Sequence, residues 1–292
     1  MILAFYILAV VFARSESALG KYNGMRGGTA VVFNLNKSLL AALFCLLISF
    51  FTGGIVFHLN TLYYSLAYGV FLAVSMICGL RALSLGSLAI ASTVVSFSLV
   101  IPTLFGVFFL DESLGALGIV ALLLLAASIV LLNYKKQSNP ISGACWFYSI
   151  ITMIANGMCS VVQKLHQTSY PGEYSSEFMF FGMSTVFVLL LIVSLVGMIW
   201  KNEKSIQTKE KNFPIKWVFI LGTIAGVCNG GANFVTLLLS ATENASVMFP
   251  IISAGNAVGS CLVGYLFFKE RLTRLQIFSL ALGILSVVLL KI

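Results

Sequence analysis

Charged residues are scarce in this chain of 292 residues, and their scarcity limits the classes of protein to which it can belong. Only 9% of the residues are Asp, Glu, Lys or Arg, against 60% that are hydrophobic. A soluble domain of this size and composition would expose large apolar patches to water. The composition therefore excludes an ordinary soluble domain and predicts an integral membrane protein.

Residues that usually carry catalysis or bind metals are also few. The two histidines, His58 and His166, have no acid or second histidine beside them, and the six cysteines form no CxxC pair and no Cys/His metal spacing. The sequence contains no Walker A motif and no convincing pair of carboxylates for acid–base chemistry. Its basic residues gather at the ends of apolar runs, which is a topology signal and not a nucleic-acid footprint. We therefore expect no enzyme, no metal, no cofactor and no nucleic-acid partner.

What the chain does have is a series of apolar runs of about 20 residues, the length that crosses a bilayer as a helix. The first run has no basic segment before it and no small-residue cleavage site after it, so we expect a retained span and not a secretory signal. Ten runs are expected to span the membrane, over residues 2–22, 34–56, 62–83, 87–110, 115–134, 143–165, 177–200, 215–239, 244–268 and 273–291. This pattern predicts an all-α, multi-pass protein with ten transmembrane helices, located in the cell membrane.

An internal repeat divides these runs into two halves, residues 1–137 and residues 138–292. The segment Phe109 to Leu114 (FLDESL) closes the fourth run, and the similar segment Phe267 to Leu272 (FFKERL) closes the ninth. The first runs of the halves also correspond when Lys21 is aligned with Lys164. Because each half holds five spans, an odd number, the second half must enter the bilayer in the opposite orientation. We expect two inverted five-helix repeats around a site near the bilayer midplane, which work by alternating access.

The basic residues also predict which side of the membrane each loop faces. All Lys and Arg residues except Arg14, Lys164 and Lys291 lie near connections that follow odd-numbered spans. Positively charged loops are retained in the cytoplasm. The charge count therefore places both termini outside.

The segments at the end of each half carry a resemblance to a known family. Residues 88–114 and residues 249–272 each form an apolar span rich in small residues, and a Glu-containing turn (Asp111-Glu112-Ser113 and Lys269-Glu270-Arg271) follows. This pattern resembles the ten-span EamA-type members of the drug/metabolite transporter superfamily. The resemblance implies a secondary active transporter, an exporter or an exchanger. It also implies cytoplasmic termini, which conflicts with the charge count. Pro102 and Pro250 depart from the family pattern, because they lie at different distances from the two turns.

Two ionisable residues in the first run are the clearest candidates for function. A charged group in hydrocarbon costs at least about 2.5 kcal/mol, so Arg14 and Glu16 require an explanation. Residues two apart on a helix point about 200° away from each other, so these two cannot pair directly. Glu16 suits a proton or a cationic group, and Arg14 suits an anionic group. The alternative is a helix that ends early and leaves both residues at its boundary.

Other polar residues recur near the middle of the runs expected to line a cavity. Asn229 and Asn233 share one helix face because they are four residues apart, and Gly230 and Gly231 between them allow the close approach of a helix or a substrate. For each amide, hydrogen bonding between helices is an equally good interpretation. The candidate substrate-binding residues are Arg14, Glu16, Ser96, Asn156, Gln163, Lys164, Asn229, Asn233 and Asn256. Glu112 and Glu270 are expected to cap the helices that follow them.

Together these features favour a secondary active transporter of a small organic metabolite or drug, by exchange or with protons as the coupling ion. Ten spans suffice for a working monomer, and a loose homodimer is the alternative. Two other functions stay open: a flippase of lipid-linked substrates with the same fold and, less favoured, a membrane-embedded enzyme.

Overall fold

The computed structural model describes residues 2–85, 93–133, 142–200, 213–269 and 273–291. This part of the chain forms ten α-helices and one 3-10 turn, without a β-strand. The expected all-α class is therefore confirmed.

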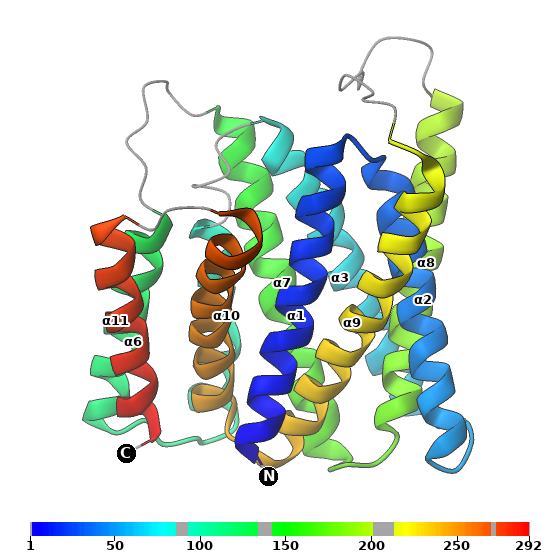
Figure 1. Cartoon of the computed structure of the whole chain (residues 1–292). Helices are drawn as coiled ribbons and strands as arrows, with labels where there is room; N and C mark the ends of the chain where they lie inside the picture. Colours follow the sequence, from blue (N-terminus) through cyan, green and yellow to red (C-terminus); the bar gives the residue numbers. More distant parts are fainter. Residues whose placement is uncertain (1, 86–92, 134–141, 201–212, 270–272, 292) are drawn as a thin grey trace.

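The helices run nearly parallel and antiparallel to one another and form one bundle (Figure 1). In chain order the elements are α1 (Ile2–Arg26), α2 (Ala30–Phe51), α3 (Leu59–Leu85), η1 (Phe97–Leu99), α5 (Val100–Phe109), α6 (Ala116–Asn133), α7 (Gly143–Ser169), α8 (Ser175–Trp200), α9 (Ile215–Thr242), α10 (Ala245–Phe268) and α11 (Arg274–Lys291).

Each of the ten expected runs lies on a helix, although the boundaries differ. The first run continues as a helix to Arg26, four residues beyond its expected end, and α2 begins at Ala30 and ends at Phe51 rather than extending over residues 34–56. Within the described residues, seven helices are long and apolar enough to cross a membrane. The other three apolar helices, Thr93–Phe109, Ala116–Leu132 and Arg274–Leu290, are shorter. Residues 87–92 of the fourth expected run lie outside the described part.

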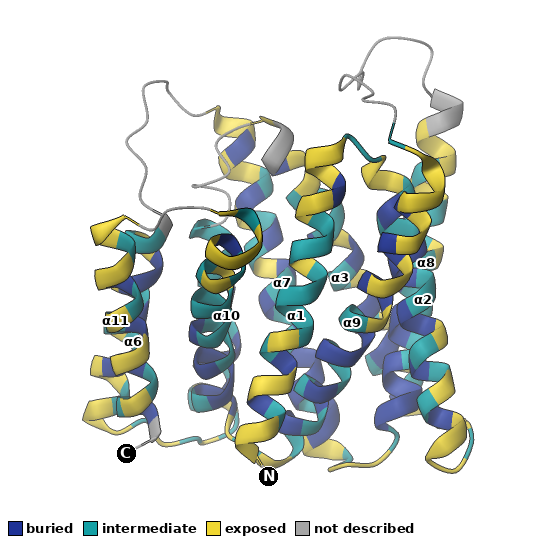
Figure 2. Cartoon of the chain, viewed as in Figure 1, coloured by how far each residue is buried: buried dark blue, intermediate teal, exposed yellow. Residues whose placement is uncertain are grey.

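The outer surface of the bundle is apolar, as lipid requires. Large side chains such as Leu3, Phe51, Phe109 and Phe267 point outward and are largely exposed. The buried residues face the interior (Figure 2), where alanine, serine and glycine are common and large aromatic residues are few. Small residues let helix backbones approach closely, and such packing holds helices together in lipid.

The glycines of α9 illustrate this packing. Gly222, Gly226 and Gly230 are spaced four residues apart and face α2. A Cβ added at Gly226 would lie 2.6 Å from the carbonyl oxygen of Lys37. The opposite face of α9 meets α1, where Gly231 contacts the ring of Phe12. Both Gly230 and Gly231 therefore make room for neighbouring helices.

The helix pairings follow a regular scheme. Helix α1 packs on α9 and α10, and α7 packs on α3 and α5. Helix α2 packs on α9, and α8 packs on α3, while α2 also contacts α8 and α6 contacts α11. When the five helices of residues 1–137 are interchanged with those of residues 138–292, the pairings of α1 and α7 map onto each other, and so do the α2–α9 and α3–α8 pairings. The α2–α8 and α6–α11 pairings map onto themselves.

The pair formed by α6 and α11 is antiparallel and is held by reciprocal hydrogen bonds. Ser128 Oγ donates to the carbonyl of Ser279 at 2.7 Å, and Ser279 Oγ donates to the carbonyl of Ser128 at 2.7 Å. Ser286 Oγ donates to the carbonyl of Ala121 at 2.8 Å. Residue numbers rise along α6 as they fall along α11, so the two helices run in opposite directions.

The two similar segments FLDESL and FFKERL also share a backbone feature. Asp111 and Lys269 occupy the same position in these segments, and both adopt the left-handed conformation, with φ of 52° and 54°. Only a few per cent of non-glycine residues have positive φ. The turn that ends α5 and the turn that ends α10 are therefore alike.

The two ends of the bundle differ in charge. Both chain termini lie at one end, which we call the termini face (Figure 1). Its described connections, residues 52–58, 110–115, 170–174 and 243–244, contain no Lys or Arg. Arg26, Lys216, Lys269 and Arg274 lie at helix ends on the opposite face.

Candidate functional site

Helix α1 carries both of its predicted ionisable residues well inside the helix. Because α1 runs from Ile2 to Arg26, the alternative that the helix ends early and leaves Arg14 and Glu16 at its boundary is wrong. The two side chains turn to different neighbours, as their angular separation requires. Glu16 turns toward α2 and α9, and Arg14 turns toward α10.

Glu16 lies at the centre of a polar network. Its Oε1 accepts a hydrogen bond from the Lys37 ammonium at 2.7 Å, and its Oε2 accepts one from Asn229 Nδ2 at 3.0 Å. The side chains of Lys37 and Glu16 are 10% and 21% exposed, so the ion pair is mostly shielded. A carboxylate and an ammonium that neutralise each other can be accommodated in the membrane, where an isolated charge is costly.

The network continues from α9 to α3. Asn233 Nδ2 donates to the carbonyl of Asn229 at 2.9 Å, and Tyr68 OH donates to Asn233 Oδ1 at 2.9 Å. Tyr68 is buried against Phe178. Four helices, α1, α2, α3 and α9, therefore meet through hydrogen-bonded side chains near the middle of α1 and α9. We call Glu16, Lys37, Asn229, Asn233 and Tyr68 the central network.

Arg14 belongs to a second group, between α1 and α10. Its guanidinium donates to Ser260 Oγ at 2.6 Å, and Ser260 Oγ donates to the carbonyl of Asn256 at 2.8 Å. Gly259 leaves room for the arginine stem, since a Cβ there would lie 2.7 Å from Arg14 Cγ. Arg14 Nε and Asn256 Oδ1 are buried, and neither has a hydrogen-bond partner among the described residues. An unsatisfied donor and an unsatisfied acceptor on neighbouring helices are the kind of groups that a polar ligand can satisfy.

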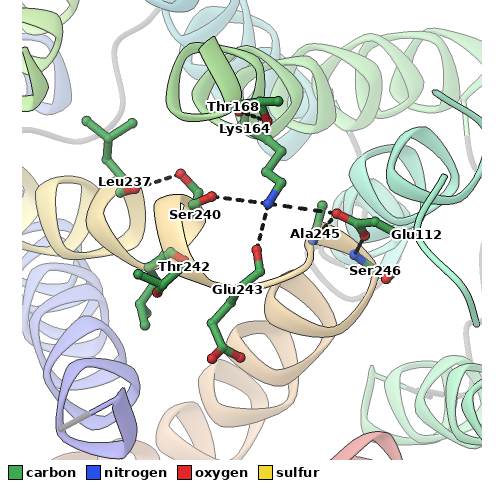
Figure 3. A network of polar contacts seen from close by, with 10 residues as sticks. Glu112, Lys164, Thr168, Leu237, Ser240, Thr242, Glu243, Ala245 and Ser246 are labelled. Carbon is green, nitrogen blue, oxygen red and sulfur yellow. Dashed lines mark hydrogen bonds and ion pairs between the residues drawn. The ribbon is translucent and has the colours of Figure 1, made fainter. Parts of the chain in front are cut away.

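Lys164 lies in a third group, near the C-terminal end of α7 and so at the termini face (Figure 1). Figure 3 shows its contacts. Its ammonium donates to the carbonyls of Ser240 at 3.1 Å and Glu243 at 2.6 Å, and lies 3.8 Å from Glu112 Oε1. Tyr6 OH donates to the Glu243 carboxylate at 3.1 Å. Tyr6 precedes Glu16 by ten residues on α1, which is about 15 Å along a helix axis. Lys164 is therefore separate from the central network.

Glu112 acts on a different helix from the one expected. Its two carboxylate oxygens accept hydrogen bonds from the backbone N–H groups of Ala245 and Ser246, each at 2.8 Å. These groups open α10, so Glu112 caps α10 and not the helix that follows it in sequence, α6. The contact joins residue 112 of the first half to the second half. Glu270 lies outside the described residues.

The family of the chain follows from a comparison with known proteins. A family model described as "Sugar transport protein" matches residues 18–292. The chain belongs to the Sugar transport protein family. It is therefore a multi-pass membrane transporter, and the match does not extend to EamA-type membership. The matched range of the Sugar transport family includes all of the central network except Glu16, which lies just before it.

The fold of this Sugar transport family member recurs among solved structures. One, titled "Crystal structure of protein", has a TM-score of 0.75 and 13% sequence identity, and the likeness covers 99% of this chain and 98% of that chain. At this identity the likeness concerns the fold alone. A search of curated proteins finds no match.

The remaining predicted residues of this family member are spread over the bundle. Asn156 Nδ2 donates to Ser98 Oγ at 2.8 Å, which fits the interpretation of an amide that joins helices. Ser96 precedes Ser98 at the start of η1. Gln163 is buried, and in the described part of the chain no group hydrogen-bonds to its Nε2.

Lys37 and Tyr68 are the residues of the central network that were absent from the predicted set. Lys37 lies near the start of the run expected over residues 34–56, so in the sequence it resembles a boundary residue. Helix α2, however, starts seven residues before Lys37, at Ala30. Tyr68 follows Tyr63 and Tyr64 in a stretch typical of interfacial aromatic residues. In the structure Tyr68 is buried, whereas Tyr63 is exposed.

Proposed function

We propose that this protein is a secondary active carrier of sugar-like small molecules, and that the central network is the core of its substrate site. The observation that carries the proposal is the contact of Glu16 with Lys37 and Asn229, at 2.7 Å and 3.0 Å, deep in the bundle. Intramembrane ionisable residues mark substrate or ion pathways in transporters. Family membership supports a sugar-like class of substrate.

The chemistry of the network suits a neutral, hydroxyl-rich substrate. The charges of Glu16 and Lys37 cancel, so the central network, which does not include Arg14, has no need of a charged ligand to balance it. A hydroxyl group both donates and accepts hydrogen bonds, so it can take the place of the direct Glu16–Lys37 and Glu16–Asn229 contacts without leaving either partner unsatisfied. Arg14 Nε offers a further donor, and Asn256 Oδ1 a further acceptor.

We further propose that residues 1–137 and residues 138–292 are inverted repeats that move against each other. Three observations support this idea: the exchange of helix pairings between the halves, the antiparallel hydrogen bonds of α6 and α11, and the matching left-handed turns at Asp111 and Lys269. In transporters built from inverted repeats, substrate binds near the midplane at the interface of the repeats. The central network joins α1, α2 and α3 to α9, and so it lies at such an interface.

The Lys164 group is the contact that would close the termini face in this mechanism. Glu112 comes from the first half, whereas Lys164 and the α10 N-terminus belong to the second. Rocking of the halves would separate these partners and open a path to the site. We keep export or exchange across the cell membrane as the proposed direction, protons as the proposed coupling ion and a monomer as the working unit.

A counterflow assay tests the proposed site without assuming a coupling ion. Vesicles that contain the purified protein are loaded with one unlabelled monosaccharide from a panel, and entry of the same labelled sugar is measured. We expect transient accumulation with at least one sugar, lost in Asn229→Ala. Asn34→Ala is the matched control, because the Asn34 amide donates to the backbone of its own helix, at the carbonyl of Ala30, and not to another described helix.

Two outcomes would contradict the proposal. Absence of counterflow with every sugar and polyol in the panel would exclude the substrate class. An equal loss of counterflow in Asn229→Ala and Asn34→Ala would mean that the central network is no more important for transport than the rest of the bundle. Coupling is then tested with an imposed pH gradient, where Glu16→Gln should abolish gradient-driven flux and leave counterflow measurable if Glu16 carries the proton.

A further inference from the structure

A cleft of about 820 Å³ opens at the face opposite the termini, where α1 ends, α10 ends and α9 begins. Its described lining combines two cationic side chains, Arg26 and Lys269, with the rings of Tyr22, Phe213, Trp217 and Phe268. None of the described lining residues is acidic, and Glu270, next to Lys269, lies outside the described part.

The cations in and beside the cleft lie against aromatic rings. The ammonium of Lys21 is 4.3 Å from the ring centroid of Phe268, and the guanidinium of Arg26 is 5.2 Å from that of Tyr22. Two cations, Arg26 and Lys269, therefore line a hollow that has aromatic walls, and Lys21 lies over the Phe268 ring of one wall. A ligand that fits this surface carries negative charge at one end and apolar groups at the other.

The surroundings of the cleft point to the membrane as the source of that ligand. Met25 and Phe267 line the cleft and are 60% and 75% exposed, on the apolar surface that contacts lipid. We adopt the orientation that the positive-inside rule predicts, with this face in the cytoplasm, because its helix ends are basic whereas the described connections of the termini face have no Lys or Arg. This orientation is opposite to the one that the resemblance to EamA-type members implies. Anionic phospholipids are concentrated in the cytoplasmic leaflet.

We propose that the cleft is a binding site for an anionic phospholipid of the surrounding leaflet. The phosphate lies between Arg26 and Lys269, and the glycerol and the first part of the acyl chains lie along Trp217 and Phe267. The site does not depend on which substrate the protein carries. Because Arg26 belongs to the first half and Lys269 to the second, a bound lipid bridges the two halves.

Quenching of Trp217 by brominated lipid tests the proposal directly. The chain has three tryptophans, so a variant with Trp146→Phe and Trp200→Phe leaves Trp217 as the only indole. The variant is reconstituted in phosphatidylcholine vesicles that contain either brominated phosphatidylglycerol or brominated phosphatidylcholine at equal mole fraction. Each basic side chain near an anionic surface changes the binding constant by about fivefold. We expect at least about fivefold preference of the cleft for the anionic lipid.

The preference should depend on the cations of the cleft and not on the charge of the whole face. Arg26→Gln with Lys269→Gln should reduce it toward equality. The control variant carries Lys216→Gln and Arg274→Gln. Both residues are exposed on the same face but do not line the cleft, so the control loses the same charge. It should keep most of the preference for the anionic lipid. Arg26→Gln alone provides an intermediate value if the double variant is unstable.

Three results would overturn the proposal. The first is equal quenching of Trp217 by both lipids in the protein with native charges. The second is an equal loss of preference in the control pair and the cleft pair, which would indicate only a general surface potential. The third is relief of quenching by millimolar inorganic phosphate, which would identify a soluble anion as the occupant.

Discussion

The ion pair of Glu16 and Lys37 offers a quantitative test of the central network. We consider Glu16→Gln, Lys37→Met and the double variant as a thermodynamic cycle. Each single change removes one charge and leaves the other in the bundle, where the side chains of Lys37 and Glu16 are only 10% and 21% exposed. The double change removes both charges. The coupling energy of the cycle measures what the two charges contribute together.

The expected magnitude follows from the geometry of the pair. Coulomb's law at a separation of 2.7 Å and an effective dielectric constant of about 20 gives a gross attraction of about 6 kcal/mol. Desolvation of the two ions offsets several kcal/mol of that attraction. We therefore expect each single variant to lose about 2–3 kcal/mol, the double variant to lose little more than one single variant, and the coupling to be about 2 kcal/mol.

Thermal unfolding of the purified protein in detergent measures these changes. A loss of 1 kcal/mol lowers Tm by about 2–4 °C in domains of 150–250 residues, so each single variant should unfold about 5 °C or more below the native protein. Glu173→Gln with Lys216→Met forms a control cycle of two exposed residues on opposite faces, with no expected coupling. If the stability loss of the double variant equals the sum of the losses of Glu16→Gln and Lys37→Met, the two charges are not coupled and the contact does not organise the site.

Three further changes test other parts of the bundle by the same measurement. Gly226→Ala should cost about 1–3 kcal/mol, because its Cβ would meet the backbone of α2, whereas Gly197→Ala, which meets no atom within 4 Å, should be harmless. Glu112→Gln should cost about 1–2 kcal/mol, because it removes the charge that caps α10 beside Lys164, and a cost no larger than that of Glu173→Gln would refute the capping role. Ser128→Ala should cost only about 0.6 kcal/mol, typical of one hydrogen bond between helices in a membrane, and a cost above about 2 kcal/mol would contradict this.

The sequence was a good guide to the helices because hydrocarbon enforces a simple rule. Backbone groups in lipid must be satisfied within the segment, so a long apolar run forms a helix. The places where the prediction erred are helix ends. Residues 23–26 continue α1, and α2 begins at Ala30, four residues before its expected start. Asn36, a polar residue near that expected start, does not end the helix, because it is buried against α9 and its amide donates to the carbonyl of Phe219 at 2.7 Å.

The site was predictable only in part because polar residues in a membrane have two uses. Glu16, Asn229 and Asn233 were expected from their positions inside apolar runs, and they do lie together. Whether an amide binds a ligand or joins helices depends on its neighbours, and spacing within one helix says nothing about them. Lys164 illustrates the limit. It lies near the end of α7 and not in the middle of the span. Its ammonium binds the carbonyl of Ser240 near the end of α9 and that of Glu243 just after α9.

The arrangement of polar contacts at the two faces gives the proposed inverted repeat a physical consequence. If the halves are interchangeable, both conformations of the carrier contain the same helix pairings, and packing alone favours neither. The balance then depends on contacts at each face that exist in one conformation only.

At the termini face, Lys164 and Glu112 hold α7, α10 and the turn after α5 together. At the opposite face, Lys21, the aligned counterpart of Lys164, lies over Phe268 at the wall of the cleft. An anionic lipid in that cleft would stabilise the conformation that is closed at the termini face. The lipid of the cytoplasmic leaflet would thus act on the same equilibrium as the substrate, because a ligand shifts a two-state equilibrium by its difference in affinity for the two states.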